Sequence, residues 1–110
     1  MTSIKDYQRF TKTTAIYPFS NSSLVQEALY LGLGLSGESG EVAELIKKQW
    51  RDNIYLDKDK FKKELGDVLW YISQLCNWAE LDLQEVIDHN IEKLTSRKGR
   101  GVLQGSGDNR

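Results

Sequence analysis

The chain has 110 residues, 28% of them charged, and a formal net charge of −1. This length suits one domain with a modest core, and the balanced charge predicts no nucleic-acid polymer and no membrane as partner. Cys76 is the single cysteine, so an internal disulfide is excluded and burial as a small hydrophobe is expected. There is neither a signal-like N-terminus nor an apolar run of the ~18 residues that span a membrane, so we expect a cytoplasmic protein.

The N-terminal segment predicts a short helix followed by a connection. Ser3 can cap a helix over residues 3–13, with Tyr7 and Phe10 three residues apart on its buried side. The following stretch TAIYPFSNSS contains Pro18, which keeps the preceding residue extended and ends the helical pattern.

A long second helix is predicted to follow. Ser23 with Gln26 three positions later is a capping-box signal, and the helical period continues to about Arg51. Glycines interrupt its first half and cost about 1 kcal/mol each against alanine in a helix. We therefore expect a bend or break there, or a close approach of another helix or of a ligand. These glycines are Gly32, Gly34, Gly37 and Gly40.

Two further helices complete the pattern. Asp57 can cap a third helix that ends near Ala79, and Asp82 with Glu85 begins a fourth that ends near Lys98. The sequence predicts an all-α, four-helix domain over residues 1–98 and a glycine-rich C-terminal tail, residues 99–110, that is mobile or partner-bound.

Large aromatic side chains exceed what four thin helices bury alone. We therefore expect a thin bundle completed by dimerisation into a homodimer, or by a dimer of dimers into a homotetramer. The side chains in question are Phe61, Trp50, Trp70, Tyr71 and Trp78.

Two pairs of carboxylates carry the strongest functional signal. Glu38 and Glu41 stand three residues apart, as do Glu64 and Asp67, so each pair lies on one face of its helix. Such spacing is common on solvated helix faces. Here, however, both pairs are surrounded by apolar residues, where an unpaired acid is costly. Oxygen ligands of this kind suit Mg²⁺, with Mn²⁺ as a substitute, so we predict a carboxylate cage for a divalent cation on two antiparallel helices.

Basic and polar groups near these acids are candidates for binding phosphate. Lys48 lies seven residues after Glu41, and Arg51 follows at the helix end. Asn90, Lys93 and Arg97 form one stripe of the fourth helix and are expected to bind phosphate or sugar, although each also suits a solvated surface. Tyr71 can stack on a base or belong to the core. His89, the only histidine, has no His or Cys partner for zinc and suits a surface or cap position.

The order GLSGESGEVAELIKK, KKELGDVLWYI and NIEKLTSRKGRG resembles the MazG-like nucleoside triphosphate pyrophosphohydrolases of the all-α NTP pyrophosphatase group, over about residues 24–104. The resemblance implies that all four acids are Mg²⁺ ligands. It also implies that Lys48, Lys93 and Arg97 bind the triphosphate, with Asn90 near the sugar or phosphates. Many members have an acid where this chain has Gly37, so Glu38 or Glu41 is our candidate for the catalytic base.

The resemblance implies Mg²⁺-dependent hydrolysis of a (deoxy)nucleoside triphosphate to the monophosphate and pyrophosphate, which clears or tailors a nucleotide pool. Alternatives are a dUTPase-, dCTPase- or phosphoribosyl-ATP pyrophosphohydrolase-like enzyme, or a non-catalytic helical dimerisation module. We expect the base to contact aromatic side chains, and the glycine-rich second helix favours a purine, guanine first. The aromatic candidates are Phe10, Tyr17, Trp50 and Tyr71.

Overall fold

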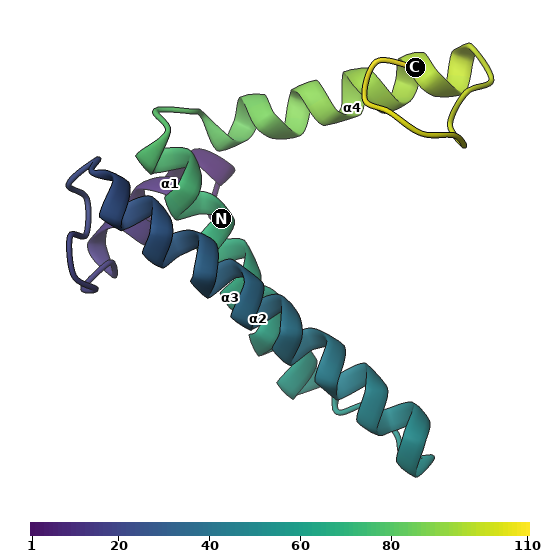
Figure 1. The fold of residues 1–110 in the computed structure, drawn as a ribbon, viewed down its shortest axis with the longest axis horizontal. Helices are drawn as coiled ribbons and strands as arrows, with labels where there is room; N and C mark the ends of the chain where they lie inside the picture. The colour runs from purple at the N-terminus through teal and green to yellow at the C-terminus, as the bar shows by residue number, and fades with distance from the viewer.

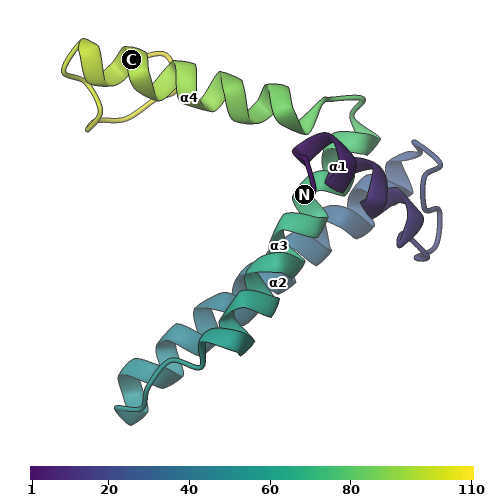
Figure 2. The same ribbon diagram turned by 180° about the vertical axis from the view of Figure 1, so that it is seen from behind.

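The computed structural model describes all residues 1–110, which form four helices and no strand, as predicted. Helices α2 and α3 lie side by side as an antiparallel hairpin, α1 packs at one end of it, and α4 extends away from that end (Figure 1). The view from behind shows the same separation of α4 from the far half of the hairpin (Figure 2). The helices are α1 (Ile4–Thr13), α2 (Val25–Asp52), α3 (Lys58–Trp78) and α4 (Leu83–Gly99).

Three helices begin at the predicted caps. The Ser3 hydroxyl accepts a hydrogen bond from the backbone N–H of Asp6 at 3.0 Å, and the Asp6 side chain completes a capping box. Asp57 caps α3 and Asp82 caps α4 through their carboxylates. These side chains satisfy backbone N–H groups that have no partner within the helix, so the local sequence determines where each helix begins.

The predicted capping box at Ser23 and Gln26 is wrong. Leu24 is the N-cap of α2 and makes no side-chain cap, while Ser23 has a left-handed backbone with φ 63°. The buried carboxylate of Glu27 instead accepts hydrogen bonds from the backbone N–H of Ser23 at 3.0 Å and of Asn21 at 2.6 Å. It also accepts one from the Tyr17 hydroxyl at 2.7 Å. A charged acceptor with three donors is a stronger partner than a serine hydroxyl, so it fixes the connection.

Helix α2 runs without a break through its glycines, so the expected interruption does not occur. Gly34 instead allows the predicted close approach of another helix, since a Cβ at that position would lie 2.1 Å from Cε1 of Tyr71 on α3. At Gly32, Gly37 and Gly40 a Cβ would meet nothing within 4 Å. The close approach of the two helices therefore requires glycine at one position only.

The core of the single chain is small. Only 10 of the 110 residues are buried, and the core cluster is Ala15, Tyr17 and Leu31 with partly buried aromatic rings packed around it. The radius of gyration is 16.7 Å, against about 13 Å for a compact domain of this length. Phe10, expected on a buried face, is 56% exposed, and Trp50 is 86% exposed. One chain alone therefore leaves much apolar surface in water.

The tail folds back along the end of α4, and its first residue completes that helix (Figure 1). Arg97 donates a hydrogen bond to the backbone oxygen of Asp108 at 2.6 Å. None of the four helices has the length and apolar character that crossing a membrane requires.

Candidate active site

Three of the four predicted metal ligands meet between α2 and α3. Glu38 of α2 and Glu64 and Asp67 of α3 each offer a carboxylate oxygen, and these oxygens all lie within 4.8 Å of one another. The register that brings Tyr71 against Gly34 also brings Asp67 opposite Glu38 one turn further along the hairpin. We refer to Glu38, Glu64 and Asp67 as the acidic cluster.

The charges acting on Glu38 are all negative. Burial raises the pKa of the Glu38 carboxyl above its usual value, and repulsion from Asp67, Glu64 and Glu41 raises it further. No cationic side chain offsets this repulsion at Glu38, which is the electrostatic arrangement expected where a divalent cation supplies the balancing charge. The donor set, carboxylate oxygen throughout, fits Mg²⁺ or Mn²⁺.

Glu41 lies close enough to act on Glu38 but does not belong to the acidic cluster, and its side chain is exposed. It is one turn further along α2, on the same face as Glu38. Its predicted role as a metal ligand or base stays a prediction.

Aromatic rings adjoin the acidic cluster. A cavity of about 280 Å³ is lined by Glu38, Asp67, Trp70 and Tyr71. Trp70 and Tyr71 pack edge to face with centroids 5.1 Å apart, and burial together with Tyr30 raises the pKa of Tyr71 to about 12. The Tyr71 phenol is therefore neutral near pH 7 and presents an apolar ring beside the carboxylates.

Sequence reasoning did not assign Trp70 or Tyr30 to this site. Tyr30 stacks on Tyr17 with centroids 4.5 Å apart and lies against Tyr71. The available signal was the spacing: Trp70 follows Asp67 by three residues and Tyr30 precedes Gly34 by four, so each shares a helix face with a residue already singled out.

The basic residues predicted on α2 have other partners. The ammonium group of Lys48 lies 3.9 Å from the Glu44 carboxylate, and the Arg51 guanidinium lies 2.7 Å from Asp52. Both pairs are at the surface of the far half of the hairpin, beyond Glu41.

The polar stripe of α4 lies on a helix that leaves the hairpin (Figure 2). Asn90 is exposed, Lys93 is partly covered and Arg97 is buried by the tail. Within one chain, α4 packs chiefly against α1. The structure therefore does not bring Lys93 and Arg97 to the acidic cluster of the same chain.

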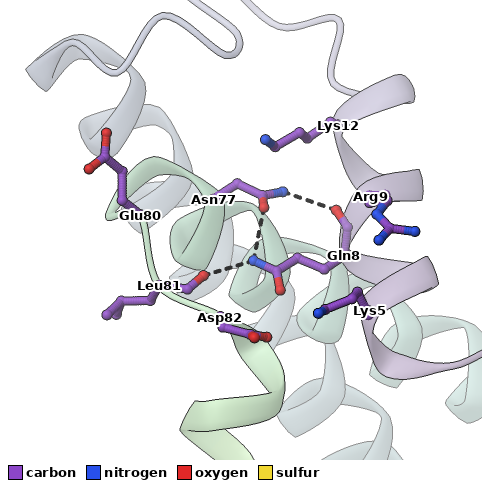
Figure 3. A pocket seen from close by; sticks show the side chains of 8 residues that line it. All are labelled: Lys5, Gln8, Arg9, Lys12, Asn77, Glu80, Leu81 and Asp82. Carbon is purple, nitrogen blue, oxygen red and sulfur yellow. Dashed lines mark hydrogen bonds between the residues drawn. The ribbon is translucent and has the colours of Figure 1, made fainter.

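A larger hollow, about 350 Å³, lies elsewhere, between α1 and the corner that joins α3 to α4 (Figure 3). Its central amides are occupied: Gln8 donates to Asn77 at 2.9 Å and to the Leu81 carbonyl at 2.8 Å. The Gln8 side-chain oxygen accepts from the backbone N–H of Leu83 at 2.8 Å. This hollow is a structural joint between α1 and the α3–α4 corner.

Comparison with known proteins agrees with this geometry. Residues 26–101, well over half of the chain, match the MazG nucleotide pyrophosphohydrolase domain. The chain belongs to the MazG family. It is therefore a hydrolase of the nucleotide pyrophosphohydrolase type, and its substrate is a nucleotide.

This MazG domain is 46% identical over 109 residues to the Gene 37 protein of Mycobacterium phage L5. The similarity covers 94% of this chain and 96% of the phage protein, whose name states no activity. No solved structure matches the chain.

Proposed function

We propose that this MazG domain hydrolyses a (deoxy)nucleoside triphosphate to the monophosphate and pyrophosphate, with Mg²⁺ as its cofactor or Mn²⁺ in its place. The observation that carries the proposal is the acidic cluster beside a cavity walled by Trp70 and Tyr71. Carboxylates suit a metal–triphosphate, and aromatic rings suit a nucleobase. We further propose that the enzyme clears or tailors a cytoplasmic nucleotide pool.

Glu38, Glu64 and Asp67 would hold the cation, with Glu41 as the fourth acid. A divalent cation bound there would supply charge neutralisation for the polyphosphate and for the leaving group. Either Glu38 or Glu41 accepts the proton of the water that attacks the α- or β-phosphorus. The bridge between the α- and β-phosphorus then breaks: attack at the α-phosphorus expels pyrophosphate, and attack at the β-phosphorus expels the nucleoside monophosphate.

The nucleobase contacts Tyr71 and Trp70 in this proposal. Of the other predicted aromatic contacts, Tyr17 is buried under Tyr30, and Trp50 lies at the far end of the hairpin. A ring of any base can stack on these side chains, so hydrogen bonds to backbone or amide groups must provide the selectivity. The open backbone at Gly32 and Gly37 favours a large base, so a purine, guanine first, is our proposed substrate.

The triphosphate contacts Lys48 and Arg51 of the hairpin and Asn90, Lys93 and Arg97 of α4. Because α4 leaves the hairpin of its own chain, we propose that its basic residues serve the acidic cluster of a second copy. In this arrangement, assembly into a homodimer or homotetramer completes the active site and also buries exposed apolar surface.

The test is pyrophosphate release with Mg²⁺ from the eight common nucleoside triphosphates and from phosphoribosyl-ATP. The proposal expects release, fastest with dGTP or GTP. Preference for dUTP or dCTP would instead favour a dUTPase- or dCTPase-like enzyme, and activity on phosphoribosyl-ATP alone would favour that hydrolase. Absence of release from every substrate would favour a non-catalytic dimerisation module.

A further inference from the structure

The tail makes a defined set of contacts that the proposed function does not use. Asp108 lies against two basic side chains of α4: its Oδ1 is 3.7 Å from Nζ of Lys93 and 3.7 Å from Nη2 of Arg97. The same guanidinium nitrogen donates to the Asp108 backbone oxygen at 2.6 Å. Arg97 is only 4% exposed. The tail therefore presents oxygens to the two cations that the proposed function assigns to the triphosphate.

Arginines hold the tail in this position. The Arg110 side chain donates to the backbone oxygens of Val102 at 2.9 Å, Leu103 at 2.8 Å and Gly107 at 2.6 Å. Arg100 donates to a backbone oxygen of Arg110 at 2.7 Å. The turn passes through Gly107 at φ 87°, a conformation that glycine adopts without strain. Asp108 is thus presented to α4 by a closed loop.

We infer that the tail is an autoinhibitory substrate mimic, in which Asp108 occupies the phosphate site of Lys93 and Arg97 until a triphosphate displaces it. This inference rests on the proposed function, because it assigns those two residues to phosphate binding. The carboxylate and the backbone oxygen stand in for two phosphate oxygens.

The contact is weak enough to be displaced. The Asp108 side chain is 89% exposed and its Oδ1 lies 3.7 Å from each cation, so water screens the ion pair from the Asp108 side. A triphosphate carries several negative charges on adjacent groups and can engage both cations at once, whereas a nucleoside monophosphate offers one phosphate. The tail therefore lowers the apparent affinity of every ligand that must displace it, and the triphosphate, which can engage both cations, is the ligand best able to do so.

The test measures binding of inorganic tripolyphosphate to the full chain by calorimetry without divalent cation. Asp108→Asn should tighten binding about threefold, the range of one exposed ion pair. A chain shortened after Gln104 should bind more tightly still, because the backbone oxygen is removed as well. Arg97→Ala in the shortened chain should abolish the gain. Glu92→Gln is the matched control, since it removes one negative charge beside Lys93 but makes no ion pair; it should change binding less than Asp108→Asn.

Pyrophosphate release by the same proteins separates this inference from the proposed function. The inference expects a lower KM for triphosphate in Asp108→Asn with kcat unchanged. An active wild-type enzyme whose tripolyphosphate binding and KM are unaffected by Asp108→Asn, or affected equally by Glu92→Gln, would overturn the inference and leave the function standing. Tighter tripolyphosphate binding in a chain that hydrolyses nothing would support the inferred anion site and refute the function. No hydrolysis and no tightening would refute both.

Discussion

At Glu38, the fold places a carboxylate where burial and three neighbouring acids all oppose its charge. The helices that hold these acids are stabilised elsewhere, through the caps of α3 and the packing of Tyr71 on Gly34. Without metal, the acidic cluster therefore destabilises the fold locally, and such destabilising groups concentrate at functional sites.

Removing one acid should stabilise the metal-free protein. For Asp67→Asn we expect the free energy of unfolding to rise by about 0.5–1 kcal/mol, because two like-charge contacts with Glu38 and Glu64 are relieved. Thermal unfolding in EDTA, at one protein concentration, measures this. Mg²⁺ should then raise the melting temperature of the wild type more than that of Asp67→Asn. Glu92→Gln, outside the acidic cluster, serves as control. If Asp67→Asn were less stable than the wild type in EDTA, repulsion within the acidic cluster would not destabilise the metal-free protein.

The raised pKa of Glu38 predicts a pH dependence of stability. The folded state binds this proton more tightly than the unfolded chain, in which the Glu38 carboxyl has its ordinary pKa of 4.5. Stability should therefore fall as pH rises from about 4.5 through the higher folded-state pKa, and the loss is complete above it. Urea unfolding at a series of pH values in EDTA measures the slope, and Glu38→Gln should flatten it. An unchanged slope in that variant would assign the dependence to other groups.

At the scale of the helix, Gly34 sets the spacing of α2 and α3. In Gly34→Ala the new Cβ would meet the Tyr71 ring at 2.1 Å. Forcing the ring aside costs about 1–3 kcal/mol and outweighs the gain of about 1 kcal/mol in helix propensity. Chemical unfolding should therefore show a less stable protein. Gly32→Ala, whose Cβ meets nothing, is the matched control and should be as stable as the wild type or more so. Equal stability of both variants would mean that α2 and α3 can separate enough to fit the new methyl group without loss of free energy of unfolding.

Helix starts were predictable where they depend on neighbouring residues. Ser3, Asp57 and Asp82 each bond to a backbone N–H within three residues, which a sequence pattern can capture. The start of α2 was not predictable in this way. Glu27 accepts from the backbone N–H groups of Asn21 and Ser23, six and four residues earlier, and both residues have a left-handed backbone that no capping pattern describes. Spacing on one helix predicted the acids, and the hairpin register then brought three of them together.

At the scale of the molecule, the direction of α4 could not be predicted, because no local pattern fixes the angle at the α3–α4 corner. It depends on contacts of the Gln8 side chain on α1, which donates hydrogen bonds to Asn77 and to the Leu81 carbonyl (Figure 3). The same side chain accepts a hydrogen bond from the backbone N–H of Leu83. The basic stripe was therefore found by its spacing, but its separation from the acidic cluster of the same chain was not foreseen.

The small core predicts self-association. Leu33 and Trp50 on α2 and Ile91 on α4 are more than half exposed, and burying apolar area stabilises by about 25 cal/mol per Å². Sedimentation equilibrium should give a mass of two or four chains. If α4 completes the site of a second copy, mixing an inactive Asp67→Asn chain with an inactive Arg97→Ala chain should restore part of the activity. A monomer at micromolar concentration, or no restoration in mixed dimers, would count against this assembly.

Pyrophosphate release by the wild type and by Asp67→Asn tests most directly whether the acidic cluster is the metal site of the enzyme. With Mg²⁺ and the preferred nucleoside triphosphate, the wild type should release pyrophosphate, and EDTA should stop it. Asp67→Asn, still helical by circular dichroism, should be slower by at least ~100-fold, because a bound cation contributes several kcal/mol to such a transition state. Near-normal turnover in Asp67→Asn, or pyrophosphate release that persists in EDTA, would contradict the proposal that the acidic cluster binds a cation required for hydrolysis.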